Sequence, residues 1–426
     1  MALSAFLFTF ATKIYRQMKK TVFALTIIML LVACHKDHPE DNEVKADRTV
    51  VIYISGENSL WDFIDNELKE MQTGSRSIGD NNLLIYVDRG NTKELPWLAR
   101  VKNGEITDSV SISDMNISSK DEYASDPRVM EAVLRYAFNN YPSKNDDYGL
   151  VLWGHASGWL INTDSIAYTV MARRKAYGVD NGKGTSSNIG KWMNIPTMSK
   201  MLSKLPHLTF IFADCCNFQC LESAYELRNV ADYIIGSPAE IPGVGAPYNT
   251  VVPAMFERTT FWKSIVDRYF EQRADGYDVP LSVIKTSEMA NLANATRTIL
   301  PGIKAVTGDG YPDMTGIIHY FIDCKFYDAN DFVLKYAPNN EYTAWKQAFD
   351  KAVIYKKMAM MWMVNGDDVQ NHYLWRSQYS DFEMTETKYG GVSMFIPQGW
   401  SGYNIFNRNI KQMGWYYAAD YSSIGW

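Results

Sequence analysis

The chain has 426 residues, a formal net charge of −6 and 14% aromatic residues, a composition typical of a soluble globular protein. It contains no concentrated basic stripe that could neutralise phosphates, which argues against nucleic-acid binding. The length exceeds one compact domain on ordinary size grounds, yet no long linker divides the chain after residue 47. We therefore expect a monomer with one core domain, residues 48–400, a substantial C-terminal elaboration and a cap formed by residues 401–426.

The N-terminus has the pattern of a bacterial export signal. Met18–Cys34 combines a basic start, an apolar stretch and small residues before a cysteine. Leu31-Val32-Ala33-Cys34 resembles a lipobox, in which Cys34 would carry the lipid. A transmembrane anchor is the alternative, but the apolar stretch of about 13 residues is shorter than the roughly 20 that a span requires. We expect a signal segment, residues 1–34, and a polar tether, residues 35–47, that attach a lipoprotein to the bacterial cell envelope, at the outer membrane or cell surface.

The rest of the chain alternates between strand-like and helix-like stretches. Apolar runs predict strands at Thr49–Ser55, Asn82–Asp88, Tyr148–Trp153, Leu208–Ala213, Ala231–Gly236, Val279–Lys285 and Gly391–Pro397, with a small hairpin around Asn103-Gly104. Helical spacing predicts helices at Leu60–Met71, Asp126–Asn140, Trp262–Arg273 and Tyr342–Met361. Continuously apolar strands separated by helices imply an α/β fold with a mainly parallel sheet covered on both faces. In such sheets, functional sites form beyond the carboxyl ends of the strands.

A histidine and two adjacent cysteines follow two of these predicted strands. His155 comes after Tyr148–Trp153, and Cys215 and Cys216 come after Leu208–Ala213. An imidazole and a thiol at neighbouring strand ends are the groups that a thiolate nucleophile and its base require. The stretch Phe218–Leu227 looks helical, and a helix beginning just after Cys216 would help to favour the thiolate.

The cysteines that follow residue 34 are expected to be free thiols. Three of them, Cys215, Cys216 and Cys220, lie within six positions, whereas a disulfide scaffold would spread its cysteines along the chain; the fourth is Cys324. A metal site formed by His155 with the three clustered cysteines is an alternative. Zinc-binding cysteines normally come as pairs two to four residues apart, and adjacent cysteines point in different directions, so we expect no metal at this site.

Several blocks of the sequence resemble the clostripain family of cysteine peptidases, which shares the caspase-like fold with caspases, gingipains and legumain. These blocks are TVVIYISGENSL at the start of the core, YGLVLWGHASGW around His155, FADCCNFQCLESAYEL around Cys216, DYIIGSPAEIPGVGAPYN after it, and GGVSMFIP, which resembles the family's last core strand. The resemblance covers most of residues 48–397. It implies a three-layer α/β/α sandwich and an endopeptidase that cuts peptides or proteins after arginine or lysine.

The resemblance also implies roles for individual residues. The base histidine of the family falls on His155 and its nucleophile on Cys216, while Cys215 stands where the family usually has alanine. Asp214, two positions before the nucleophile, falls on the aspartate that helps to hold the basic side chain of the substrate. Glu240, in the loop after the fifth predicted strand, is a further candidate for adding negative charge to this pocket.

The chemistry also requires donors for the oxyanion, and the candidates are the backbone amides of Cys216 and Ala156. The family usually has glycine at position 156, and alanine keeps the amide but restricts the backbone. Together with Cys215, this departure leaves a second interpretation open. In that interpretation, the protein is an inactive surface lipoprotein that uses the peptidase fold to bind a peptide or glycan.

Between the two site blocks, residues 162–194 form a long segment rich in glycine, serine and basic residues. Some relatives mature by cutting themselves in this region, so we expect cleavage after Lys175 or after one of the adjacent arginines. An ordinary solvated basic loop is the alternative. The reaction requires no cofactor. Calcium is a possible ligand because some relatives need it, although no acidic loop has a recognisable calcium spacing.

Overall fold

The structure is a computed structural model that describes residues 46–90, 93–115, 117, 123–161, 177–182, 190–271, 278–308, 310–321, 326–363, 373–375 and 382–426. By its contacts, Lys45–Trp426 forms one compact unit. None of the helices among the described residues has the length and apolar character that a bilayer span requires.

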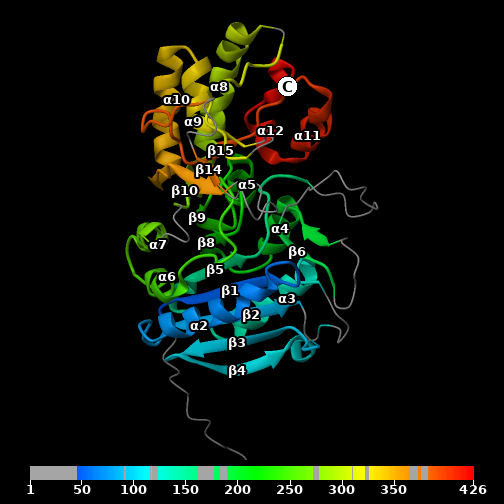
Figure 1. Cartoon of the computed structure of the whole chain (residues 1–426), viewed down its shortest axis with the longest axis vertical. Coiled ribbons are helices and arrows are strands. Elements are labelled where there is room, and N and C mark those ends of the chain that lie inside the picture. The colour runs from blue at the N-terminus through cyan, green and yellow to red at the C-terminus, as the bar shows by residue number, and fades with distance from the viewer. Residues whose placement is uncertain are drawn as a thin grey trace, which may run out of the picture. The chain divides into compact units, whose positions relative to one another are not determined.

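A nine-stranded sheet forms the centre of this unit (Figure 1). Its strands are β1 (Thr49–Gly56), β2 (Asn82–Arg89), β3 (Trp97–Lys102), β4 (Glu105–Ser111), β5 (Tyr148–Trp153), β8 (Leu208–Asp214), β9 (Ala231–Gly236), β10 (Leu281–Lys285) and β12 (Val353–Lys357). They follow one another across the sheet in the order β12-β10-β9-β8-β5-β1-β2-β3-β4. The five strands from β9 to β2 pair in parallel, and antiparallel pairs complete the sheet on both sides. The mainly parallel sheet predicted from the apolar runs is therefore confirmed.

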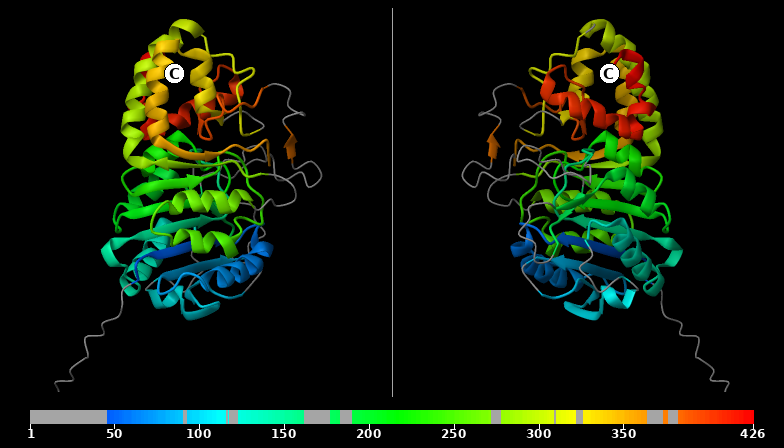
Figure 2. Two further views of the ribbon diagram at one scale, coloured as in Figure 1. Left: turned by 90° about the vertical axis from the view of Figure 1, so that its left-hand side faces the viewer. Right: turned by 90° about the vertical axis from the view of Figure 1, so that its right-hand side faces the viewer.

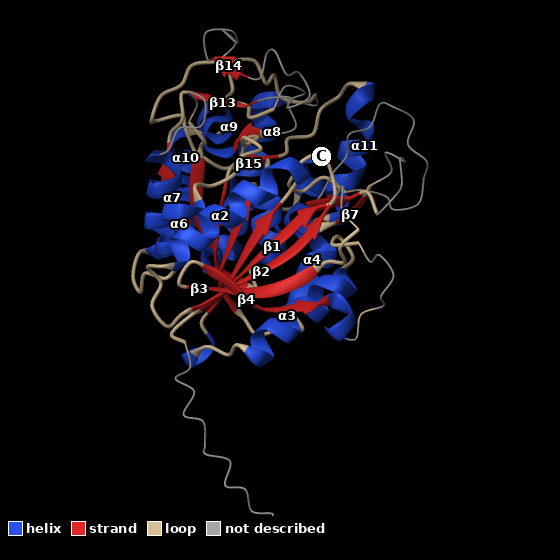
Figure 3. Ribbon diagram, turned by 60° about the horizontal axis from the view of Figure 1, so that its bottom comes forward, coloured by secondary structure: helices blue, strands red, loops and turns tan. Residues whose placement is uncertain are grey.

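Helices cover both faces of the sheet, so its central strands are buried along nearly their whole length. One face packs against α2 (Ile64–Ser75), α6 (Tyr248–Met255) and α7 (Phe261–Glu271). The other face packs against α3 (Pro127–Asn140), α4 (Ile195–Leu202) and α5 (Leu221–Leu227). Figure 3 shows α2, α6 and α7 on one side of the strands and α3 and α4 on the other. The α2 face and the α5 face are the names used below for these two sides.

The C-terminal part of the chain adds helices beyond the β10–β12 edge of the sheet (Figures 1 and 2). They are α8 (Met289–Thr307), α9 (Ala329–Tyr336), α10 (Asn339–Ala352), α11 (Asn404–Asn409) and α12 (Gly414–Ala418). Within the described ranges, three two-stranded sheets lie outside the main sheet. They pair β6 (Tyr177–Asp180) with β7 (Lys191–Met193), β11 (Tyr327–Asp328) with β15 (Ser393–Met394), and β13 (Met361–Met363) with β14 (Tyr373–Trp375). Near the C-terminus, the buried Trp415 packs against Tyr225 of α5, with the ring centroids 5.8 Å apart.

Away from the predicted site, two of the predicted elements differ in kind from the structure. The helix expected over Tyr342–Met361 ends at Ala352, and the chain continues as β12, which pairs antiparallel with β10. The strand expected over Gly391–Pro397 is reduced to β15, which pairs with β11 outside the main sheet. The physical reason is that side chains take up the amides of this stretch. Phe395 donates its N–H to Glu222 at 2.7 Å, and Asp328 accepts the N–H of Gly391 at 3.1 Å.

Candidate active site

Two neighbouring central strands end at the same level, and the predicted histidine and cysteine follow them. β5 and β8 pair in parallel, with Trp153 opposite Asp214 at the carboxyl end. His155 and Cys216 each come two residues later, and both are half-buried. Because paired strands lie about 4.8 Å apart, the chain brings both residues to the same edge of the sheet.

Short-range contacts fix the approach of His155. Gly154 has φ 142°, and a Cβ at this position would lie 2.8 Å from the carbonyl oxygen of Ser55, so only glycine fits. The carbonyl of His155 accepts the N–H of Gly178 at 2.8 Å. The hydroxyl of Ser59 lies 2.9 Å from Nε2 of His155. Sequence analysis did not identify Ser59, although its position after β1, a third strand of the same edge, was an available signal.

Cys216 packs on the α2 face of the sheet. The N–H of Ile241, in the loop after β9, points at its sulfur with an N···S distance of 3.5 Å. The carbonyl oxygen of Ile241 lies 3.9 Å from the same sulfur, so Cys216 contacts both backbone groups of this residue. This contact between the thiol and a distant loop was not predictable from local sequence.

The helix that was expected to begin just after Cys216 begins later. α5 begins at Leu221 and not at Phe218. The intervening residues are not helical, because their amides bond to the loop after β9: the N–H of Asn217 donates to the carbonyl of Ala239 at 2.9 Å, and the N–H of Gln219 donates to the carbonyl of Ser237 at 3.0 Å. The predicted contribution of a helix N-terminus at the thiol is therefore wrong.

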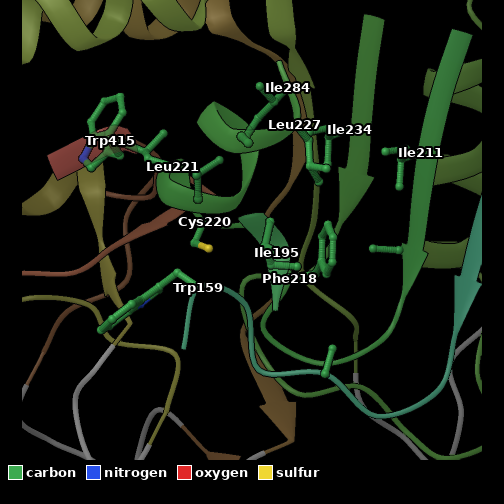
Figure 4. Packing of buried hydrophobic residues seen from close by; sticks show 14 of the residues in the cluster. Trp159, Ile195, Ile211, Phe218, Cys220, Leu221, Leu227, Ile234, Ile284 and Trp415 are labelled. Atoms are coloured by element: carbon green, nitrogen blue, oxygen red, sulfur yellow. The ribbon is translucent and has the colours of Figure 1, made fainter. Parts of the chain in front are cut away.

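Cys215 and Cys220 lie on the opposite, α5 face and are almost completely buried. Burial raises the pKa of both thiols far above the usual range. The Cys220 thiol lies 3.1 Å from the hydroxyl of Ser223. Figure 4 shows Cys220 among large apolar side chains that include Trp159 and Leu221. These two cysteines are packing residues that stay protonated.

The metal site that was weighed as an alternative does not form. His155, Cys215, Cys216 and Cys220 do not bring their ligand atoms together, and the three cysteines are free thiols, as expected. Within the described ranges, the group of side chains that converges closely enough to hold a metal is a different one. It consists of Glu57, Asp88 and Asp180, with ligand atoms within 4.8 Å of one another.

This acidic group lies at the ends of β1, β2 and β6 and is buried. Burial raises the pKa of Asp180, which accepts the N–H groups of Gly182 at 2.9 Å and Ala124 at 2.5 Å. Carboxylate oxygens are the ligands that calcium prefers, so the donor set fits a hard divalent cation. Asp180 also forms side-chain hydrogen bonds with Glu57 and Asp88, and these bonds could stabilise the three acids without a cation.

Asp214 is buried on the α2 face and is held by three donors. Its Oδ2 accepts the N–H of Ala246 and the hydroxyl of Tyr248, both at 2.9 Å, and its Oδ1 accepts the hydroxyl of Tyr269 at 3.0 Å. Burial raises the pKa of Asp214 to about 6 although these donors oppose the shift. The carboxylate is therefore mostly ionised at neutral pH, two residues from Cys216.

The backbone at Ala156 is compatible with a role as donor. Ala156 forms an isolated antiparallel bridge with Tyr177 of β6. The hydrogen bond of this bridge runs from Gly178 to the carbonyl of His155, so it does not consume the Ala156 N–H. Ala156 is not among the residues with positive φ, so alanine in place of glycine causes no strain at this position.

Glu240 directly precedes Ile241, whose N–H contacts the Cys216 sulfur. Glu240 is half-buried in the loop after β9, where its backbone pairs with Met363 of β13, and the three donors to Asp214 come from other residues. Lys175, in the predicted processing segment, and Cys34, the predicted lipid attachment site, lie outside the described residues.

A mainly parallel α/β/α sandwich with a thiol at the end of a central strand points to the class of cysteine peptidases with a caspase-like fold. Comparison with known proteins agrees. The sequence profile of the clostripain family matches residues 52–426. Clostripain of Hathewaya histolytica is 21% identical over 88% of this chain and 79% of its own length.

Among the solved structures that are similar to most of the chain are two C11 proteases. One is a secreted C11 cysteine protease from Bacteroides thetaiotaomicron in complex with an irreversible peptide inhibitor, with a TM-score of 0.69 and 30% identity over 89% of this chain and 100% of that one. The other is an inactive zymogen C11 protease from Parabacteroides distasonis, with a TM-score of 0.70 and 27% identity over 88% and 98%. The chain belongs to the clostripain family and is a cysteine peptidase with the caspase-like fold.

Proposed function

We propose that the protein is an endopeptidase that cleaves after arginine or lysine, with Cys216 as nucleophile and His155 as acid and base. The observation that carries the proposal is the pairing of Trp153 with Asp214, because each of the two reactive residues follows this pair by two positions. The half-exposed thiol and the nearby half-buried imidazole agree with these roles, whereas the other described cysteines are sealed.

In this mechanism, the Cys216 thiolate attacks the carbonyl carbon of the scissile peptide bond. The backbone amides of Cys216 and Ala156 bind the oxyanion that forms. His155 gives its proton to the leaving amine as the C–N bond breaks, which leaves an acyl-enzyme. His155 then takes a proton from water as the water attacks the thioester, and the carboxylate product leaves with the thiol regenerated.

Asp214 is proposed to select the basic side chain of the substrate. It is a buried acid on the same face of the sheet as Cys216, and its pKa of about 6 leaves it ionised at neutral pH. A buried negative charge requires a positive partner more strongly than an exposed one does. Arginine and lysine satisfy this requirement, whereas aspartate or glutamate would add a second negative charge.

Self-cleavage after Lys175, or after one of the arginines beside it, is proposed to mature the enzyme. The description of the Parabacteroides distasonis relative as an inactive zymogen supports a maturation step in the family. In this chain, the segment that follows the proposed cut, β6, is bridged to Ala156 through Tyr177. A cut just before β6 would therefore act next to the histidine. An active protein that stays uncut on a denaturing gel would remove this part of the proposal.

The proposed setting is the bacterial cell envelope, with a lipid on Cys34. Metabolic labelling with a fatty acid tests this, and Cys34→Ala should abolish the labelling. Calcium is proposed as a ligand of Glu57, Asp88 and Asp180 and not as a participant in the reaction. A chelator should then lower the melting temperature of the protein, and Asp88→Asn should remove this sensitivity.

The experiment that tests the central proposal is hydrolysis of fluorogenic peptides ending in arginine, lysine or aspartate. We expect cleavage after the basic residues alone, abolished by Cys216→Ala and preserved by Cys215→Ala. No cleavage by a folded protein, together with no labelling of Cys216 by iodoacetamide, would instead establish the alternative of an inactive binding module.

A further inference from the structure

A glutamate lies where the sheet-facing side of α2 requires an apolar residue. The helix buries Ile64, Glu67 and Met71 on the same face, at helical spacing. Glu67 is 1% exposed. In the sequence, Glu67 is surrounded by charged residues and therefore resembles a residue on the exposed side of a helix. The structure instead turns its carboxyl group into the interior.

Both carboxyl oxygens of Glu67 are buried, and neither has a hydrogen-bond partner in the described part of the chain. No lysine or arginine forms an ion pair with Glu67 among these residues. Burying a polar group without a partner is unfavourable, so such groups call for an explanation. A ligand that supplies the missing donors is one.

The Glu67 carboxyl converges on the same point as Asp214. A Cβ built on Gly245 would lie 2.8 Å from Oδ2 of Asp214, 3.1 Å from Nε1 of Trp153 and 3.5 Å from Oε1 of Glu67. The two acidic side chains and the indole therefore border the same point beside Gly245, and any side chain at position 245 would collide with Asp214. Gly245 has φ 60°, which favours glycine at this position independently of space.

The two acids differ in how many acceptor positions they still offer. A carboxylate has about four lone-pair positions, and Asp214 already uses three, for Ala246, Tyr248 and Tyr269. A guanidinium group carries five N–H donors in a planar fork and needs more acceptors than Asp214 has left. The oxygens of Glu67 offer these acceptors.

We propose that Glu67 is the second carboxylate of the recognition site and binds the cationic end of the substrate side chain together with Asp214. This inference rests on the proposed specificity for basic residues. It assigns to Glu67 the specificity-determining acceptors that Asp214 lacks. It also predicts a preference for arginine over lysine, because the fork can reach both acids at once and an ammonium group is a single point.

Binding of the substrate cation is expected to release a proton from Glu67. Burial, followed by the charges of Asp214 and Glu70, raises the pKa of Glu67 to about 10. The phenol hydroxyls of Tyr248 and Tyr269 also face it and are neutral, since burial raises the pKa of both. In the free enzyme, Glu67 therefore holds a proton at neutral pH. A bound cation reverses the balance, so the Glu67 O–H gives its proton to solvent when arginine binds.

The test is calorimetric binding of the peptide acetyl-Ala-Ala-Arg-amide to the Cys216→Ala protein, which cannot cleave it. Titrations at pH 7.5 in phosphate and in Tris, which differ in ionisation enthalpy, count the protons exchanged. We expect release of about one proton. Glu67→Gln keeps the shape and should abolish the release and weaken binding at least tenfold. Glu105→Gln, on the exposed part of β4, is the control and should keep the proton count.

A structural role for Glu67 predicts other results. Glu67→Met removes the buried carboxyl, so it should preserve or raise the melting temperature while it abolishes arginine binding; a lower melting temperature would instead mark Glu67 as structural. If wild type cleaves after arginine and Glu67→Gln has the same kcat/KM and proton count, only the role of Glu67 is overturned. If wild type neither cleaves after nor binds basic residues, the proposed specificity fails with it.

Discussion

The residues that follow β8 lie on opposite faces of the sheet, and the two faces give them different surroundings. On the α5 face, Cys215 is sealed in apolar packing together with Cys220. On the α2 face, Asp214 and Cys216 lie among hydroxyl, amide and carboxyl groups, and the Cys216 side chain is half-exposed. Both cysteines lie in the turn that directly follows β8, which sends their side chains to opposite faces of the sheet.

The comparison shows that the face of the sheet on which a cysteine lies, and not its residue type, separates a structural thiol from a reactive one. Burial in an apolar setting keeps a thiol protonated, and only the thiolate is a nucleophile. Asp214 and Glu222 make the same point for carboxyl groups, because each is buried on one of the two faces. Asp214 belongs to the proposed site, whereas Glu222 bonds to the backbone of a distant segment.

The largest expected effect separates the two adjacent cysteines. Cys216→Ala should lower kcat for peptide hydrolysis by about 10⁴-fold or more, because no other described thiol can replace it. Cys215→Ala should leave kcat within a few-fold, although it loses a little stability as a small cavity forms. Fluorogenic peptide assays measure both. Equal losses of kcat in the two variants would contradict the proposal that only the cysteine on the α2 face is the nucleophile.

The second prediction concerns the charge on the α2 face. Asp214→Asn keeps the shape of the side chain and removes the negative charge, so kcat/KM for arginine and lysine peptides should fall about 10²-fold. Labelling of Cys216 by iodoacetamide measures the thiol separately and should change little. A parallel loss of labelling would indicate that Asp214 acts on the nucleophile and not on the substrate.

The third prediction uses a methyl group to fill the point where the acids converge. Gly245→Ala places a Cβ 2.8 Å from Asp214 Oδ2 and should lower kcat/KM for basic peptides about tenfold. Gly79→Ala is the matched control, since Gly79 has a nearly identical φ of 62° and nothing within 4 Å of the added Cβ. Both variants should lose about 1 kcal/mol of stability from the left-handed backbone. Only the first should lose activity.

The central strands could be predicted because each is a continuous apolar run, and the site residues at their ends followed from the parallel arrangement. β12 was missed because Val353–Lys357 continues a helical pattern, and only pairing with β10 makes it a strand. The non-helical segment before α5 was missed because its amides bond to a loop about 20 residues away in the sequence. Local patterns carry no information about such partners.

The same limit explains which parts of the candidate site the sequence left out. His155 and Cys216 stand in the sequence directly after their strands. Ser59 and Glu67 belong to the segment after β1, and only the folded sheet brings Ser59 to the histidine and Glu67 to the point bordered by Asp214. Whether a glutamate on a helix points into the core depends on what the helix packs against. The polar residues around Glu67 in the sequence give no sign of this packing.

The smallest effect is expected on the α5 face and concerns stability alone. Glu222 is fully buried, and its Oε1 accepts the N–H of Phe395 at 2.7 Å. Burial raises its pKa from 4.5 to about 7. A carboxyl group with a raised folded-state pKa stabilises the fold below pH 4.5, and this contribution is lost as the pH rises through about 7.

Glu222→Gln cannot ionise and keeps an acceptor for Phe395. Relative to this variant, wild type should therefore lose up to about 3 kcal/mol of unfolding free energy between pH 4.5 and pH 7.5. Urea unfolding at both pH values measures the difference, and Glu105→Gln, on the exposed part of β4, is the control. Peptidase activity at neutral pH should be unchanged. A loss of activity in Glu222→Gln with stability intact would mean that the α5 face shares in the chemistry, and the contrast between the two faces would fail.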